Sequence, residues 1–156
     1  VGSISNDSQL LINSTEKALE KGILEVKSGV RVGDISCAIQ GYSEGLGYSV
    51  VKQYVGHGIG QELHEEPQIP NYGKKGLGPI LLSGMVIAIE PMLTIGKSDT
   101  MLLDDGWTVE ILTENEKWLV DIRKGREVPT ITCRSEGGVP FTTANEYIVD
   151  SVKKIS

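Results

Sequence analysis

Two histidines and one glutamate are the residues of this chain whose types and surroundings could do metal chemistry. His57 lies in the stretch Gly56-His57-Gly58-Ile59-Gly60, and the only other histidine, His64, follows seven residues later. Glycine leaves space beside an imidazole and lets the backbone adopt unusual dihedral angles, so a metal ion or a substrate could approach His57. The Gly and Pro content disfavours a helix and predicts a strand that enters a turn. The alternative at this point is two ordinary surface or core histidines.

Glu90 is a lone carboxylate inside an apolar run. Residues 85–93 read Met-Val-Ile-Ala-Ile-Glu-Pro-Met-Leu, a pattern typical of a buried strand. An ionised carboxylate in such a run is costly unless it is paired or bound to a cation, and Pro91 removes a backbone donor from the strand ladder. Glu90 is therefore a candidate metal ligand or catalytic acid and base. The alternative is a glutamate on a solvent face near the end of a strand.

Two helices are expected before these residues. The first covers residues 7–27, with capping oxygens available at residues 5–8. The second begins near Asp34, which can cap it, and ends by Gly45. The apolar stripes that we expect to face the core are Leu11, Thr15, Ala18, Leu19, Gly22, Ile23 and Val26 in the first helix and Ile35, Ala38, Ile39, Tyr42 and Leu46 in the second.

Strands and turns are expected over the rest of the chain. Tyr48–Val55 is rich in β-branched and aromatic residues and predicts a strand that delivers His57 to its end. Residues 67–80 contain three prolines and several glycines, which predict a loop. A turn is expected at residues 104–106, with a strand starting directly after it. Further short strands are expected at 118–120, 130–132 and 147–149.

Composition narrows the class of protein. A chain of 156 residues suggests one domain with a real core, and a net charge of -6 argues against a nucleic-acid partner. No apolar run reaches membrane-spanning length, and no signal peptide is visible. Cys37 and Cys133 match no metal-binding spacing and no disulfide framework, so we expect two reduced thiols and a cytoplasmic protein. Because the chain begins at Val1 rather than Met, we expect a processed or cut piece.

Four motifs stand together in the order and approximate spacing of type I methionine aminopeptidase. They are Gly56–Gly60, His64-Glu65-Glu66-Pro67, Gly84-Met85 with Ile89-Glu90-Pro91-Met92, and Asp105-Gly106-Trp107-Thr108-Val109. The chain resembles this family from about Val1 to Glu110. The resemblance implies an α+β fold, the C-terminal half of the pita-bread fold, in which two helices pack on a curved, mainly antiparallel sheet. It divides the chain into a half pita-bread domain, residues 1–110, and a β-rich tail, residues 111–156, expected to pack on the same domain.

The resemblance also implies a function, the removal of N-terminal methionine from polypeptides with two divalent metal ions, typically Co, Mn, Fe or Zn. The family binds them with two Asp, one His and two Glu, and here His57 matches the histidine ligand. Glu90 matches the first glutamate ligand, which also moves the proton, and His64 the histidine that contacts the substrate amide. Leu63 and Trp107 fall where the family builds its methionine pocket. Carboxylates and imidazole suit such ions, and a pair of ions polarises the scissile carbonyl.

The chain also departs from this pattern. The family's two Asp ligands belong to an N-terminal half that this sequence lacks, and no Ala-Gln-Phe-Glu-His-Thr strand with the second Glu ligand follows Val109. Instead Glu110–Thr113 resembles the segment that normally comes after that strand. One alternative is that residues 144–149 are a degenerate version of the lost strand, which would make Glu146 the second glutamate. One His and one Glu cannot hold a bridging pair of cations alone, so the resemblance implies an incomplete site.

Three hypotheses follow from the sequence. The first is a metal-dependent aminopeptidase that is active only with a complementary half-domain. The second is a non-catalytic binding or scaffold module built on a degenerate half of the fold. The third is a joined reading frame whose tail is unrelated to the rest. An uncovered inner face of the half-sheet would promote self-association, unless the tail covers it.

Overall fold

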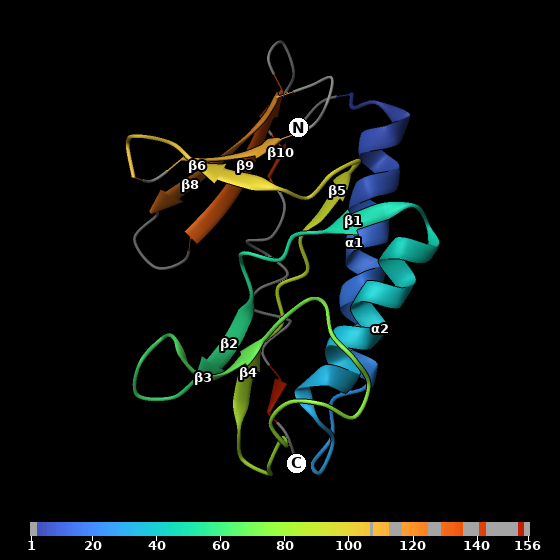
Figure 1. The fold of residues 1–156 in the computed structure, drawn as a ribbon, viewed down its shortest axis with the longest axis vertical. Coiled ribbons are helices and arrows are strands. Elements are labelled where there is room, and N and C mark those ends of the chain that lie inside the picture. The colour runs from blue at the N-terminus through green and yellow to red at the C-terminus, as the bar shows by residue number, and fades with distance from the viewer. Residues whose placement is uncertain are drawn as a thin grey trace.

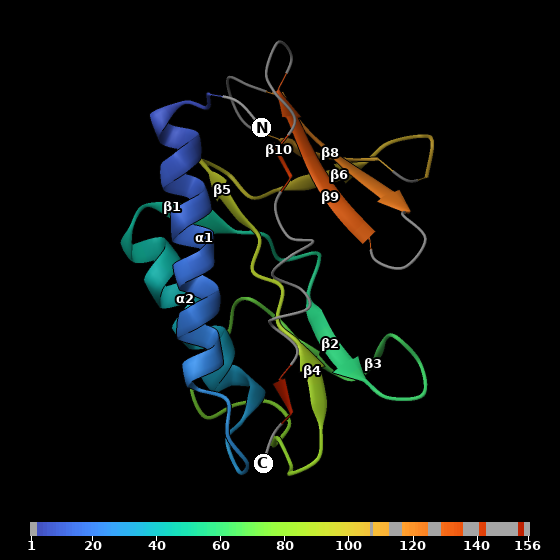
Figure 2. The same cartoon turned by 180° about the vertical axis from the view of Figure 1, so that it is seen from behind.

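Two helices form one layer of the molecule and the strands form the other. The computed structural model describes residues 3–106, 108–112, 117–124, 129–135, 141–142 and 153–154. Helix α1 (Asn6–Leu24) and helix α2 (Val32–Gly45) lie side by side, and the strands lie along one side of them in both opposite views (Figures 1 and 2). The layer of helices is therefore the frame on which the strands are placed.

The described strands form three antiparallel sheets, with the orders β1-β5, β11-β4-β2-β3 and β10-β9-β8-β7-β6. Their bounds are β1 Tyr48–Val50, β2 Gly56–Ile59, β3 Glu65–Ile69, β4 Val86–Ala88, β5 Leu93–Ile95, β6 Thr100–Leu102, β7 Val109–Leu112, β8 Lys117–Lys124, β9 Pro129–Ser135, β10 Phe141–Thr142 and β11 Lys153–Lys154. Two helices packed on antiparallel strands confirm the predicted α+β class.

The core lies between the helix layer and the strands. The side chains that are fully shielded from solvent come from both layers: Ala18, Ile35, Ile39, Ile69, Leu81 and Ile87. Burial of one such aliphatic side chain contributes about 1.5–3 kcal/mol to stability. The predicted stripes are confirmed at their centres. The prediction that Leu46 faces the core is wrong, because Leu46 is the residue after the last turn of α2 and is 52% exposed. Two serines, Ser36 and Ser43, are buried on α2 instead.

The helix ends differ in detail from the prediction. Ser5 caps α1, since its Oγ accepts a hydrogen bond from the Ser8 backbone N–H at 3.1 Å. Asp34 is not the cap residue of α2, because the helix begins two residues earlier, at Val32. Its carboxylate instead accepts from the backbone N–H of Arg31 at 2.9 Å and from that of Gly76 at 2.9 Å. Asp34 therefore fixes both the start of α2 and the loop that lies against it.

Two predicted strands are broken in the structure. The first ends at Val50, and the chain then leaves the β1-β5 sheet, so that His57 lies inside the separate strand β2 rather than at the end of a long one. The apolar run 85–93 divides into β4 and β5, with Glu90 in the irregular segment between them. Hydrophobicity alone cannot reveal such a break, because an apolar segment that changes sheets stays buried.

Two further predictions concern the loop and the tail. The expected loop at 67–80 begins later, since Pro67 belongs to β3, an edge strand where proline is tolerated. The turn at 104–106 and the strands at 118–120 and 130–132 are confirmed, whereas 147–149 lies outside the described residues. Strand β11 pairs with β4, with Lys153 opposite Ile87. Cys37 is a free thiol, and none of the described helices is long and apolar enough to cross a membrane.

Candidate metal-binding site

The glycines around His57 allow strands to approach each other closely. A Cβ atom on Gly56 would lie 2.3 Å from the carbonyl oxygen of Ala88 in β4, and one on Gly58 would lie 2.3 Å from that of Glu66 in β3. Neither residue has a positive φ, so the predicted unusual dihedral angles are wrong here. The glycines are needed because a Cβ atom at either position would collide with a backbone oxygen of a neighbouring strand, and His57 lies between these two glycines in β2.

His57 is oriented by its own strand. It is opposite Ala88 in the β2-β4 ladder, and its side chain is 11% exposed. The ring Nδ1 lies 2.9 Å from the backbone oxygen of Gly58. Because a carbonyl oxygen can only accept, Nδ1 carries the hydrogen and donates it. This hydrogen bond fixes the tautomer and leaves Nε2 to face the site, the arrangement common for histidines that bind metals.

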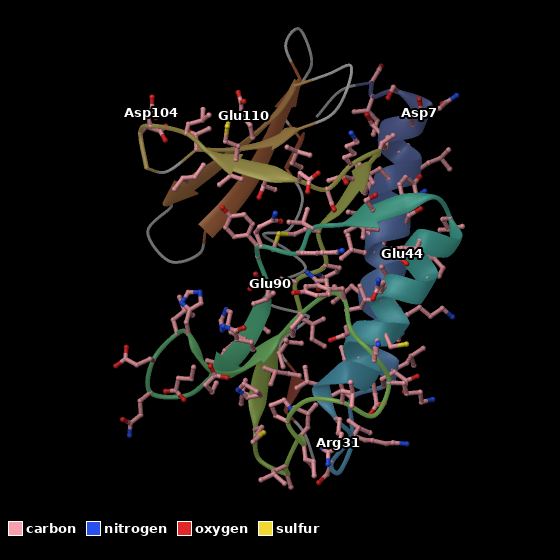
Figure 3. All side chains as sticks on the ribbon, in the orientation of Figure 1. Asp7, Arg31, Glu44, Glu90, Asp104 and Glu110 are labelled. Carbon is pink, nitrogen blue, oxygen red and sulfur yellow. The ribbon has the colours of Figure 1, made fainter. Side chains whose placement is uncertain are left out.

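Glu90 faces His57 from the segment after β4. It follows Ala88, the last residue of β4, by two residues, and Ala88 is paired with His57. Glu90 Oε1 lies 3.4 Å from His57 Nε2, and its side chain is 24% exposed. Figure 3 shows Glu90 among the strands, beside β2, whereas Glu44 lies on α2. Burial raises the pKa of the Glu90 carboxyl, and the nearby His57 and His64 oppose this increase.

His64 completes this group from the turn between β2 and β3. Its ring centroid lies 4.1 Å from that of His57, with an angle of 43° between the ring planes. The side chain is exposed. Glu65 braces the turn, because its Oε1 accepts a hydrogen bond from the backbone N–H of Glu62 at 2.8 Å. The structure thus brings His57, His64 and Glu90 together from three segments of the chain.

Three further site residues were predicted from the sequence. Leu63 is in the same turn as His64 and is 53% exposed. Trp107 and Glu146 lie outside the described residues. A surface depression of about 420 Å³ lies at the β6-β7 hairpin and is lined by residues 101–105, none of which belongs to the histidine and glutamate group. The methionine pocket and the second glutamate ligand therefore stay predictions.

The pair formed by His57 and Glu90 suits a divalent cation. When the imidazole is neutral, with its hydrogen on Nδ1, it presents a lone pair at Nε2, and the carboxylate oxygen 3.4 Å away is also an acceptor. Two acceptors that face each other at this distance are stabilised by a proton or a cation between them. Within the described part of the chain, however, no group of three or more His, Cys, Asp or Glu residues could hold a metal ion. The pair therefore fits as part of a ligand set.

Comparison with known protein families shows the family of this chain. The model of metallopeptidase family M24 matches residues 1–137. This chain belongs to metallopeptidase family M24. The match extends past Glu110, where the resemblance by motifs ended, and includes part of the predicted β-rich tail, residues 111–156. Members of a metallopeptidase family use metal ions, so the family membership supports a divalent cofactor.

Several curated relatives of this chain are methionine aminopeptidases. Methionine aminopeptidase B of Synechocystis sp. is 44% identical over 136 residues, which are 84% of this chain and 50% of the relative. Methionine aminopeptidase 1 of Bacillus subtilis is 53% identical over 109 residues, which are 70% of this chain and 44% of the relative. The chain thus spans about half the length of the curated relatives that it matches.

Solved structures of M24 enzymes confirm the fold. The methionine aminopeptidase of Thermotoga maritima superposes with a TM-score of 0.70 at 40% identity, covering 80% of this chain and 52% of that one. The enzyme of Rickettsia prowazekii gives 0.69 at 41% identity, with the same coverage. The predicted identity of the fold, one half of a pita-bread structure with its two helices on antiparallel strands, is therefore correct.

One residue beside the site was not found from the sequence. Asn71 is completely buried, and its Nδ2 donates a hydrogen bond of 2.6 Å to the backbone oxygen of Glu90. The only signal was a polar residue between Pro70 and Tyr72 in a segment expected to be a loop. A loop residue contacts the site here because the segment folds back under Glu90.

Proposed function

We propose that this chain carries one half of a metal-dependent methionine aminopeptidase site, and that it releases N-terminal methionine from polypeptides when a complementary half-domain supplies the remaining ligands. The observation that carries the proposal is the convergence of His57 Nε2 and Glu90 Oε1 at 3.4 Å in an M24 chain. Its curated relatives are methionine aminopeptidases of about twice the matched length. A cytoplasmic location is part of this proposal.

Each residue of the group has its own task in this proposal. His57 and Glu90 would hold divalent metal, of which the family binds two, and the ions would supply a nucleophile at neutral pH and polarise the scissile carbonyl. His57 is held ready by the hydrogen bond of Nδ1 to Gly58. Glu90, whose pKa is raised by burial, is suited to accept and return a proton. The exposed His64 is placed to contact the substrate amide, and Leu63 and Trp107 are assigned to the methionine pocket.

A binding or scaffold role is the second candidate function. It is favoured by the ligand count, because the described residues offer no third His, Cys, Asp or Glu at a position that could hold a metal with the first two. In this case the chain keeps the fold and binds a partner without catalysis. The two functions differ in whether a metal ion stabilises the chain and in whether methionine is released.

The deciding experiment combines this chain with the N-terminal half of the Bacillus subtilis relative, which is 53% identical over the shared part. The two fragments are co-expressed and assayed for free methionine from a Met-Ala-Ser peptide with Mn²⁺ or Co²⁺. We expect metal-dependent release that falls at least about a hundredfold in His57→Ala and in Glu90→Gln. Glu20→Gln, on the exposed face of α1, is the control. Absence of release with every metal, from a complex shown to form, would favour the scaffold role.

A further inference from the structure

The backbone around Glu90 has little support from the sheets. Strand β4 ends at Ala88 and β5 begins at Leu93, so Glu90 lies in the gap between two strands of different sheets. The next residue, Pro91, has no N–H to donate. A buried segment without ladder hydrogen bonds needs other partners for its carbonyl groups. The position of the Glu90 carboxylate therefore depends on what holds its own main chain.

Asn71 holds that main chain. Its side chain is 0% exposed, and Nδ2 lies 2.6 Å from the Glu90 backbone oxygen, which can only accept. In the described part of the chain its Oδ1 has no hydrogen-bond partner. A buried amide oxygen left in this state costs about 1–3 kcal/mol. An asparagine at this position is therefore not explained by stability alone. It is explained if its role is to hold Glu90 in a fixed position.

Asn71 is itself fixed, because helix α2 holds the loop on both sides of it. On one side Ser36 Oγ donates to the backbone oxygen of Pro70 at 2.5 Å. On the other side the backbone N–H of Gly73 donates to Gln40 Oε1 at 3.0 Å. A Cβ atom on Gly73 would lie 3.0 Å from the Ser36 Cβ, so the loop rests directly on the helix. These contacts connect α2 to Glu90 through one side chain.

We propose that Asn71 is a positioning residue, which transfers the fixed geometry of α2 to the Glu90 backbone and thereby sets the Glu90 carboxylate against His57. The inference rests on the proposed function to the extent that Glu90 is taken as a metal ligand. Outer partners of metal ligands set ligand orientation, and their loss typically lowers metal affinity by about 10- to 100-fold. Asn71 touches neither substrate nor metal in this proposal, so its effect passes through Glu90.

Asn71→Asp is the sharpest variant, because it keeps the shape and replaces the donor with an acceptor. An oxygen would then face the Glu90 carbonyl, and the hydrogen bond of 2.6 Å would become a repulsion. Mn²⁺ binding is measured by calorimetry on the complex of this chain with the N-terminal half of the Bacillus subtilis relative. We expect the affinity to fall about tenfold or more. Ser43→Ala is the matched control, since it removes another buried hydrogen bond from α2, to Ile39 O, and should change the affinity less than about twofold.

A measurement without metal separates this inference from the proposed function. Wild-type chain should show a nuclear Overhauser effect between the His57 ring protons and the Glu90 Hγ protons, because Nε2 and Oε1 are 3.4 Å apart. The effect should disappear in Asn71→Asp and persist in Ser43→Ala. Its absence in the wild type, or its persistence in Asn71→Asp, would overturn the inference. Failure of the wild-type complex with the complementary half-domain to bind Mn²⁺, with the Overhauser pattern as expected, would count against the proposed function alone.

A second variant covers the case in which Asn71→Asp fails to fold. Gln40→Ala removes the anchor of Gly73, and Gln40 is only partly buried. We expect a weaker Overhauser effect between His57 and Glu90. The control is Glu44→Ala, which removes the other hydrogen-bond partner of Gln40, at 2.8 Å, on the exposed surface of α2. An identical Overhauser effect in wild type, Gln40→Ala and Glu44→Ala would contradict transfer of geometry from α2.

Discussion

At the scale of single residues, Glu90 is held in a place that does not favour its charged form. Burial raises the pKa of its carboxyl above the ordinary value of 4.5, although two histidines lie close by. A group whose pKa is raised on folding contributes stability that is present below its unfolded pKa and is lost as the pH increases through the folded value. Without metal, the ionised Glu90 therefore lowers the free energy of unfolding at neutral pH.

We accordingly predict that Glu90→Gln stabilises the metal-free chain at neutral pH. The glutamine side chain is neutral at every pH. The variant therefore does not lose free energy of unfolding over the pH range in which the wild-type carboxylate ionises. The melting temperature of Glu90→Gln minus that of the wild type should increase between about pH 4 and pH 8 in the presence of a chelator. Glu20→Gln is the control, because Glu20 is exposed on α1. A difference for Glu90→Gln that is constant with pH, or that decreases as the pH increases, would contradict the prediction.

Individual site residues could be predicted where their chemistry is local. His57 could be found because glycines surround it, and Glu90 because a carboxylate interrupts an apolar run. Asn71 could not be found in this way, since its partner is a backbone oxygen 19 residues away and the contact depends on how a loop folds back. Residue type reveals a possible ligand, but only tertiary structure reveals what holds it.

At the scale of elements, helix α2 supports the loop that follows Asn71. The helix surface must be flat where this loop crosses it, because a Cβ atom on Gly33 would lie 2.3 Å from the Lys74 oxygen and 2.6 Å from the Leu77 oxygen. Both are backbone atoms, so the loop would have to move away. By contrast, a Cβ atom on Gly41 in the same helix would have no atom within 4 Å outside the helix.

The two glycines should therefore respond in opposite ways to alanine. Gly33→Ala should lower the free energy of unfolding by about 1–3 kcal/mol, as is usual when extra atoms are forced into a packed region. Gly41→Ala should raise it by about 0.5–1 kcal/mol, because alanine favours the helix more than glycine does. Urea unfolding followed by circular dichroism measures both. Equal effects of the two substitutions would show that the loop does not rest on α2 as described.

The element boundaries were less predictable than the elements. Both helices follow from the period of their apolar residues, whereas the break of the run 85–93 into β4 and β5 is not visible in it. The reason is that Ile89 and Leu93 are buried on both sides of Glu90. The apolar sequence pattern therefore continues through the point at which the chain passes from one sheet to another. Pro91 was the one local sign of the break.

At the scale of the whole molecule, the chain corresponds to about half of its curated relatives and has exposed apolar residues. Two of them, Met101 at 45% and Leu102 at 58% exposure, are on β6, the last strand in the order of its sheet. Ile95, at the end of β5, is 43% exposed. Exposed apolar side chains on an edge strand favour pairing with another chain.

We predict that the isolated chain self-associates through β6. Its weight-average sedimentation coefficient should increase with concentration, and the double variant Met101→Lys/Leu102→Lys should weaken the association at least about tenfold, because two charges would have to be desolvated at the contact. Leu46→Lys, at the exposed end of α2, is the control for an added charge on an apolar surface position and should leave the association unchanged.

Sedimentation also distinguishes non-specific aggregation from association through a surface that binds a specific partner. If β6 normally faces a complementary half-domain, then the N-terminal half of a relative should compete with self-association and leave a single species at a one-to-one ratio, since one surface cannot serve both contacts. A wild-type chain that stays monomeric at all concentrations would contradict self-association. A complement that binds while the oligomers persist would show that the partner uses a different face.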